Sequence, residues 1–150
     1  MAPAFSKSEY ESRLARVRAE MAARGLDALV IGDADNINWL TGYDAWSFYT
    51  PQMMLLDMHD GPFWMGRLMD AGAASFTTYL TPAQVVPYPE NLVQRTDTHP
   101  MAYLAEWMAG HGFAKARIGY ESDSYFFTPR AFAALCSGLP DASFVDADLL

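Results

Sequence analysis

The sequence predicts an α/β domain of three layers, α/β/α, in which helices cover both faces of a mixed, mostly parallel sheet with one antiparallel hairpin. Two observations carry this prediction. Short apolar runs typical of buried strands alternate with amphipathic helical stretches along most of the chain. One pair of apolar runs is joined instead by a short turn at His59, Asp60 and Gly61, where Asp-Gly is a hairpin signal. Parallel strands that follow helices are expected to connect by right-handed crossovers.

The first predicted element is a helix over Ser8–Arg24. Ser8 and Glu11 have the spacing of a capping box, and Gly25 lies where a left-handed C-terminal cap is expected. The arginines, Arg13 among them, are expected mainly outside the apolar stripe. That stripe consists of Leu14, Val17 and Met21.

The later elements follow the same logic of apolar runs separated by turn residues. Pro100 and Pro129 suit the first turn of a helix, and Pro87 confines its strand to an edge of the sheet because it cannot donate a ladder hydrogen bond. The predicted strands are Asp27–Ile31, Gln52–Met58, Phe63–Arg67, Gln84–Tyr88, Arg117–Tyr120 and Ser143–Val145. The predicted helices after the first are Asn36–Leu40, Asp70–Tyr79, Pro100–Ala109 and Pro129–Ser137.

Composition indicates one globular domain over residues 1–150. Hydrophobic residues make up 51% of the chain and charged residues 19%. A chain of 150 residues can bury enough surface to form a core without stabilisation by a metal or a disulfide. A net charge of −8 argues against nucleic acid and against an anionic membrane as partners, since both attract Lys and Arg. With a single cysteine, no signal-peptide segment and no apolar run of membrane-spanning length, the sequence predicts a cytoplasmic protein.

Candidate metal and nucleophile residues have simpler structural interpretations. There is no glycine-rich phosphate loop, no G-x-S-x-G and no pair of cysteines for zinc. Asp57, His59 and Asp60 could ligate a metal, but a solvated turn explains them better. Cys136 lies on an apolar helix face, where cysteine packs as a small hydrophobe rather than acting as a nucleophile.

Two histidines flank the helix predicted at Pro100–Ala109. His99 precedes the helix and is expected to cap or line its start. His111 follows its last turn, where a cation would favour the helix dipole. We expect both histidines to be structural or to have no role.

The stretch from Asp33 to Asp57 has the densest run of aromatic residues. Trp46, Phe48 and Tyr49 either belong to the core or form an exposed interface or cation-binding surface, and some are expected to face outward because a polar break precedes them. Arg67 ends a strand and Asp70 starts a helix. They are either a ligand site at the end of the sheet or an ion pair with a helix N-cap.

The segment NINWLTGY at Asn36–Tyr43, together with the first helix, FWMGR at Phe63–Arg67 and the following DA-x-A, resembles the N-terminal domain of the creatinase/prolidase/aminopeptidase P family. The combination of NINWLTGYDAWSFY, FWMGR-x-x-DA-x-A and the later HPM resembles the ectoine hydrolase subgroup. The resemblance covers nearly the whole chain. It implies a fold with a ribonuclease H-like motif, and a C-terminal catalytic pita-bread domain that these residues do not contain. The ending at Leu149 and Leu150, directly after a strand, is also expected of a fragment.

The resemblance implies that catalysis belongs to that second domain. In the peptidases of the family it binds two divalent metal ions through two Asp, one His and two Glu, so no catalytic or metal-binding residue is expected in this chain. The implied roles here are homodimer assembly and shaping of the entrance for a small zwitterionic amide or amidine substrate. Candidates for that entrance are Trp46, Tyr49, Arg67 and Asp70. The alternative is a metal-free creatinase-like parent or an inactive binding and assembly protein.

Overall fold

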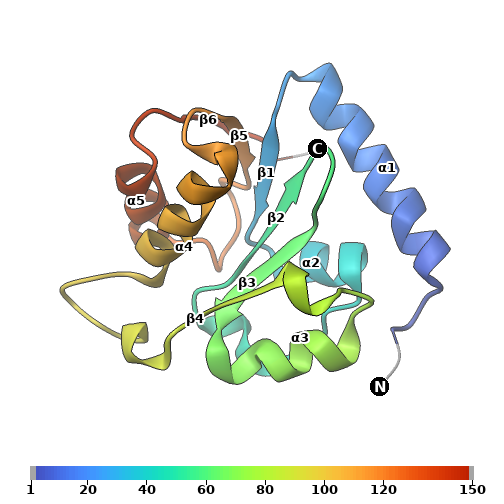
Figure 1. Cartoon of the computed structure of the whole chain (residues 1–150), viewed down its shortest axis with the longest axis horizontal. Helices are drawn as coiled ribbons and strands as arrows, with labels where there is room; N and C mark the ends of the chain where they lie inside the picture. The colour runs from blue at the N-terminus through green and yellow to red at the C-terminus, as the bar shows by residue number, and fades with distance from the viewer. Residues whose placement is uncertain (1–2, 149–150) are drawn as a thin grey trace.

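A computed structural model describes residues 3–148, and in that range helices lie on both faces of a six-stranded sheet (Figure 1). The helices α4 and α5 cover one face, and α1, α2 and α3 lie on the other. This is the predicted three-layer α/β/α arrangement.

The elements occur close to the predicted positions. The strands are β1 (Ala28–Ile31), β2 (Met53–Asp57), β3 (Phe63–Arg67), β4 (Val85–Tyr88), β5 (Arg117–Tyr120) and β6 (Ser143–Asp146). The helices are α1 (Lys7–Ala23), α2 (Ala34–Thr41), α3 (Ala71–Thr77), α4 (Pro100–Met108) and α5 (Pro129–Gly138). Two short 3₁₀ helices matter for the site, η1 (Trp46–Tyr49) and η2 (Leu68–Asp70).

The sheet has the order β4-β3-β2-β1-β5-β6. β2 pairs antiparallel with both of its neighbours, β1 and β3, whereas the pairs β3–β4, β1–β5 and β5–β6 are parallel. Only β2 therefore runs against the rest of the sheet, which confirms a mixed, mostly parallel sheet with an embedded hairpin. Pro87 lies on the edge strand β4, where its missing N–H costs no ladder bond.

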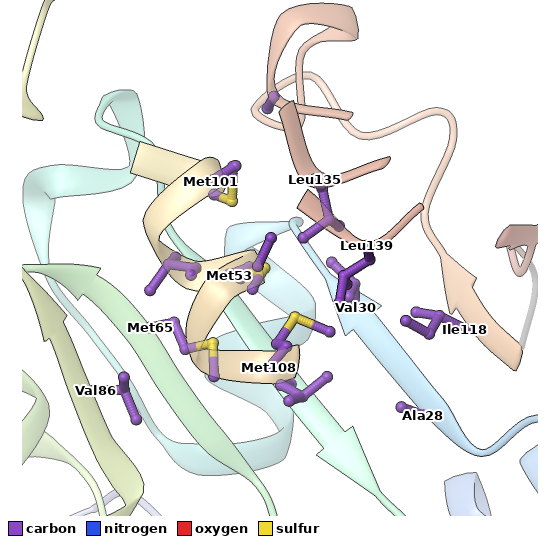
Figure 2. Close-up of a cluster of buried hydrophobic side chains, with 14 of the residues drawn as sticks. Ala28, Val30, Met53, Met65, Val86, Met101, Met108, Ile118, Leu135 and Leu139 are labelled. Carbon is purple, nitrogen blue, oxygen red and sulfur yellow. The ribbon is translucent and has the colours of Figure 1, made fainter. Parts of the chain in front are cut away.

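Strand alternation divides the core into two clusters. In β1, Ala28 and Val30 belong to the cluster under α4 and α5, while Leu29 and Ile31 belong to the cluster under α1 and α2. Figure 2 shows the first cluster, which combines Met53 and Met65 of the hairpin with Met101 and Met108 of α4 and Leu135 of α5. Methionine suits this position because its flexible thioether fills irregular gaps between helix and sheet.

The start of α1 differs from the prediction. Its N-cap is Ser6, whose hydroxyl accepts a hydrogen bond from the backbone N–H of Glu9 at 3.3 Å, so the assignment of the cap to Ser8 is wrong. Arg13 is also buried rather than outward. Its Nη1 donates to the carbonyl of Trp39 at 2.7 Å, and its Cζ lies 4.3 Å from the centre of the Phe5 ring. Aromatic faces and a carbonyl thus replace water around the guanidinium.

The β2–β3 hairpin turn is held by a side chain. The Oδ1 atom of Asp57 accepts hydrogen bonds from the backbone N–H groups of His59, Asp60 and Gly61, at 3.1, 2.7 and 2.6 Å. The carboxylate that sequence alone offers as a metal ligand is therefore used to close the turn. Among residues 3–148 there is no group of three or more His, Cys, Asp or Glu side chains that could hold a metal ion.

Candidate functional site

Helix α2 and the segment after it lie at the carboxyl end of β1. Asp33 caps the helix, since its Oδ1 accepts from the backbone N–H of Asp35 at 2.9 Å and of Asn36 at 3.3 Å. Gly42 ends it in the left-handed region with φ of 79°, where a side chain would be strained and would meet the Tyr10 hydroxyl. The chain then turns into η1 and enters β2. The aromatic stretch is in this way fixed at both ends.

The partly buried Arg67 and the buried Asp70 form an ion pair that holds η1 in place. Arg67 Nε donates to Asp70 Oδ2 at 2.6 Å, and Arg67 Nη2 donates to Ser47 Oγ at 3.1 Å. The Ser47 hydroxyl in turn donates to Asp70 Oδ1 at 2.6 Å. Hydrogen bonding to Asp70 raises the pKa of Arg67, which stays a cation. The predicted ion pair is present, and Asp70 occupies the N-cap position of α3, but its side chain makes no capping hydrogen bond there because it is bonded to Arg67 and Ser47.

The aromatic side chains of η1 divide between solvent and core. Trp46 is 84% exposed and Tyr49 69% exposed, whereas Phe48 is half-buried and its ring centre lies 5.1 Å from that of Phe126. The Tyr49 ring centre lies 6.0 Å from Cζ of Arg67. The structure therefore brings Tyr49, Arg67 and Asp70 together. Trp46 belongs to the same short helix but lines a separate hollow.

That hollow, the α2–η1 cavity, has a volume of about 410 Å³. Its rim carries the exposed residues Asp35, Asp44 and Trp46, and two buried residues, Tyr43 and Gln52, also line it. The remaining lining residues are Ala34, Asn38, Ala45 and Phe48. A cavity of this size is in the range that holds small molecules.

The model of the Creatinase/Prolidase N-terminal domain matches residues 13–150. The chain belongs to the creatinase/prolidase N-terminal domain family. It is 46% identical to an ectoine hydrolase of Halomonas elongata over 97% of this chain and 37% of the relative. It is 40% identical to the uncharacterized hydrolase/peptidase y4tM of Sinorhizobium fredii, over 97% of this chain and 38% of that protein. The chain thus spans little more than a third of the length of these curated relatives.

The fold of this creatinase/prolidase N-terminal domain also matches solved structures. A proline dipeptidase from Streptococcus agalactiae superposes with a TM-score of 0.72 at 16% identity, covering 93% of this chain and 95% of that one. At such low identity the likeness concerns the fold alone.

Sequence reasoning missed two polar residues of the creatinase/prolidase N-terminal domain, Ser47 and Glu121. Ser47 was not singled out, although it links η1 to the ion pair. Glu121 directly follows β5, and its Oε2 accepts from the backbone N–H groups of Gly32 and Asp33, both at 2.7 Å. Burial raises the pKa of the Glu121 carboxyl. The position of Glu121 directly after a predicted strand is a signal that sequence offers, because polar residues at the carboxyl ends of adjacent parallel strands lie close together. β1 and β5 form such a pair.

The remaining candidates have structural roles. His99 Nδ1 accepts from the backbone N–H of Met101 at 3.1 Å, which confirms a cap at the start of α4. His111 stacks on Trp107 with ring centres 3.6 Å apart. Cys136 is partly buried, and burial raises the pKa of its thiol, the opposite of what activates a nucleophile. Within residues 3–148 we find no helix with the length and hydrophobicity of a membrane span.

Proposed function

We propose that this domain is the non-catalytic N-terminal part of a C–N bond hydrolase and that it shapes the substrate entrance of a catalytic pita-bread domain carried by the same, longer polypeptide. Support comes from the length of the relatives, of which this chain covers 37% and 38%. Further support comes from the way in which the titratable side chains of the described residues are used. Asp57, Asp70, Glu121 and His99 are committed to internal hydrogen bonds rather than arranged as an acid, a base and a nucleophile.

The observation that carries the entrance role is the placement of two exposed aromatic rings over a rigid base. Trp46 and Tyr49 flank Ser47, which is buried and bonded to both members of the ion pair. Because this loop is already fixed, little conformational entropy is lost when a ligand or a second domain binds to its rings. Aromatic faces of this kind suit the cationic part of a small zwitterionic amide or amidine, such as the substrate of an ectoine hydrolase or an Xaa-Pro peptide.

The cofactor of such a parent would lie outside this domain. Two divalent metal ions are implied by the family resemblance, and the described residues include no cluster of three or more His, Cys, Asp or Glu that fits one. When bound, the metals would activate water for attack on the substrate. This chain would contribute orientation of the substrate and homodimer assembly in the cytoplasm, with the catalytic domain as its first partner.

Kinetics of the full-length parent test the entrance role. Replacing Trp46 with Ala should lower kcat/KM for the preferred substrate about tenfold, mainly through KM, since the ring contributes to binding. Tyr103→Ala is the matched control, because Tyr103 is a partly exposed aromatic on α4, on the other face of the sheet. Ectoine and a proline dipeptide should be compared as substrates.

Unchanged kinetics in a folded Trp46→Ala enzyme would remove the entrance role. A parent that turns over neither substrate with added divalent metal would instead favour the alternative of a metal-free creatinase-like enzyme or an inactive assembly protein.

A further inference from the structure

Helix α3 exposes its large apolar side chain instead of burying it. The helix packs against β3 and β4 at the β4 edge of the sheet (Figure 1). Of its seven residues, all of which the structure describes, only Ala74 is buried. Phe76, the largest side chain of α3, is 72% exposed. A surface helix normally turns large apolar residues inward and charged residues outward, as α1 does with Lys7, Glu11 and Glu20. The reversed arrangement of α3 indicates an interaction surface.

The 3₁₀ helix η2 runs directly into α3 and extends its exposed apolar stripe. Leu68 and Met69 of η2 are 55% and 69% exposed. Met69, Gly72, Ala73 and Phe76 recur at the spacing of one helix face. At the exposed Gly72, an added Cβ would meet no described atom beyond its own helix and chain neighbours within 4 Å. These five residues form the η2–α3 face, in which two large side chains, Met69 and Phe76, flank a notch of small residues.

The η2–α3 face lies in a nearly uncharged part of an acidic chain. Residues 68–89 contain a single charged residue, Asp70, although the chain has a net charge of −8. The Asp70 carboxylate is buried in its ion pair and does not charge the surface. Glu90 lies at the margin, where its Oε1 accepts from the backbone N–H of Met69. An apolar centre with a polar rim is the usual composition of a protein–protein contact.

The shape and charge of the η2–α3 face fit a second copy of the chain. Two acidic chains repel each other, so their contact is favoured where neither presents charge. The Phe76 ring and the notch at Gly72 lie about one helical turn apart on the same stripe. About a two-fold axis between them, the ring of each copy would enter the notch of the other, and one geometry would satisfy both copies. Two such faces would bury roughly 1,000 Å², the lower limit for a specific interface.

We propose that the η2–α3 face is a contact between two copies of this chain, in which antiparallel α3 helices pack Phe76 of one copy against Gly72 of the other. An interface at the lower limit of size is expected to dissociate in the micromolar range. The surface would supply the homodimer contact of the proposed function and rests on that function to this extent. It does not include Trp46, and association is measured without turnover. Dimerisation and the entrance role can therefore fail independently.

Sedimentation velocity of the 150-residue chain over a series of concentrations tests this contact. We expect a reversible equilibrium between monomer and dimer that persists when salt is added, because the contact is apolar. A chain that stays monomeric up to about 1 mM would overturn the proposal and leave the face to another partner, such as the catalytic domain. Dimerisation that disappears in about 0.5 M sodium chloride would also overturn it, since charged surfaces would then form the contact.

Gly72→Leu distinguishes a fitted contact from general hydrophobic association. The new side chain has open space and replaces glycine within a helix, so the variant should fold at least as well as the parent. It adds apolar surface but fills the notch, and should weaken dimerisation about tenfold or more through the clash with the partner's ring. The control is Gly110→Leu, at an exposed and equally open glycine after α4, which should dimerise like the parent. A Gly72→Leu variant that dimerises as strongly as this control would refute the proposed packing.

Phe76→Ser tests the ring itself. It should weaken dimerisation about a hundredfold, because each dimer loses two buried rings at the centre of the contact. The control is Tyr125→Ser, which removes a ring that is 91% exposed in the loop between β5 and α5, outside the η2–α3 face. In dilute protein, where the chain is monomeric, both variants should unfold in urea like the parent. Equal dimerisation of the two variants would show that the η2–α3 face is not the contact.

Discussion

The core under α4 and α5 and the region around η1 differ in residue composition. Under α4 and α5 the cluster of buried residues is apolar, with several methionines (Figure 2). On the other side, Tyr43 and Trp64 belong to the buried cluster and bring a hydroxyl and an indole N–H into it, with their ring centres 5.3 Å apart. The ion pair of Arg67 and Asp70 and the α2–η1 cavity lie beside η1, near the end of the hairpin. The core under α4 and α5 therefore depends on packing, whereas the region around η1, at the end of the hairpin, retains polar groups whose cost makes sense if they contact a ligand or a second domain.

This contrast predicts different responses to substitution. On the apolar face, stability should depend on volume, because tightly packed interiors respond to each lost methylene. Around η1 it should depend on pairing, because an uncompensated buried charge is more costly than a lost contact. Three experiments test that distinction.

The largest effect is expected at the partly buried ion pair of Arg67 and Asp70. Arg67→Ala leaves the buried Asp70 carboxylate with only the Ser47 hydroxyl as a hydrogen-bond donor among the described residues, and should lower the free energy of unfolding by about 3–5 kcal/mol. Urea denaturation of the 150-residue chain measures it. The double variant Arg67→Met with Asp70→Leu is the control, and it should recover most of the loss because no buried charge remains. A double variant as unstable as Arg67→Ala would mean that packing, not pairing, governs this region.

A slightly smaller effect is expected on the apolar face. Leu135 is fully buried between α5 and the sheet cluster, and Leu135→Ala should cost about 3 kcal/mol through lost burial and a residual cavity. Phe76→Ala, which truncates a ring that is 72% exposed on α3, should change stability by less than about 0.5 kcal/mol. Equal losses in the two variants, measured in the same urea series, would contradict the view that burial determines the cost.

The fold was largely predictable because its signals are local. Apolar runs, prolines at helix starts and the hairpin turn place most strands and helices within a few residues. The error at the first cap shows the limit of such rules. Ser6 and Glu9 have the same spacing as Ser8 and Glu11, so the capping pattern occurs twice and only the folded chain selects the earlier one.

The candidate site was less predictable because its bonds join distant positions. Arg13 looks like a surface residue by helical periodicity, but it is buried against the carbonyl of Trp39 and the ring of Phe5. Ser47 acquires its role only when Asp70 arrives from 23 positions later. The pair of Arg67 and Asp70 was accessible from sequence because its members are three residues apart. What sequence could not show is that the same pair also bonds η1.

The smallest effect concerns the carboxyl ends of the adjacent strands β1 and β5, where Glu121 joins the end of β5 to the start of α2. Burial raises the pKa of its carboxyl in the folded chain, so the folded state holds this proton to higher pH than the unfolded state. Stability from this group is therefore present at low pH and is lost as the pH rises from the ordinary value of about 4.5 through the raised folded pKa. Glu121→Gln removes the titration, so the stability of the parent relative to this variant should fall across that window. Urea denaturation of both proteins at several pH values measures the difference. A parent that gains stability relative to Glu121→Gln as the pH rises would show instead that the hydrogen bonds from Gly32, Asp33 and Asn36 outweigh burial and favour the carboxylate.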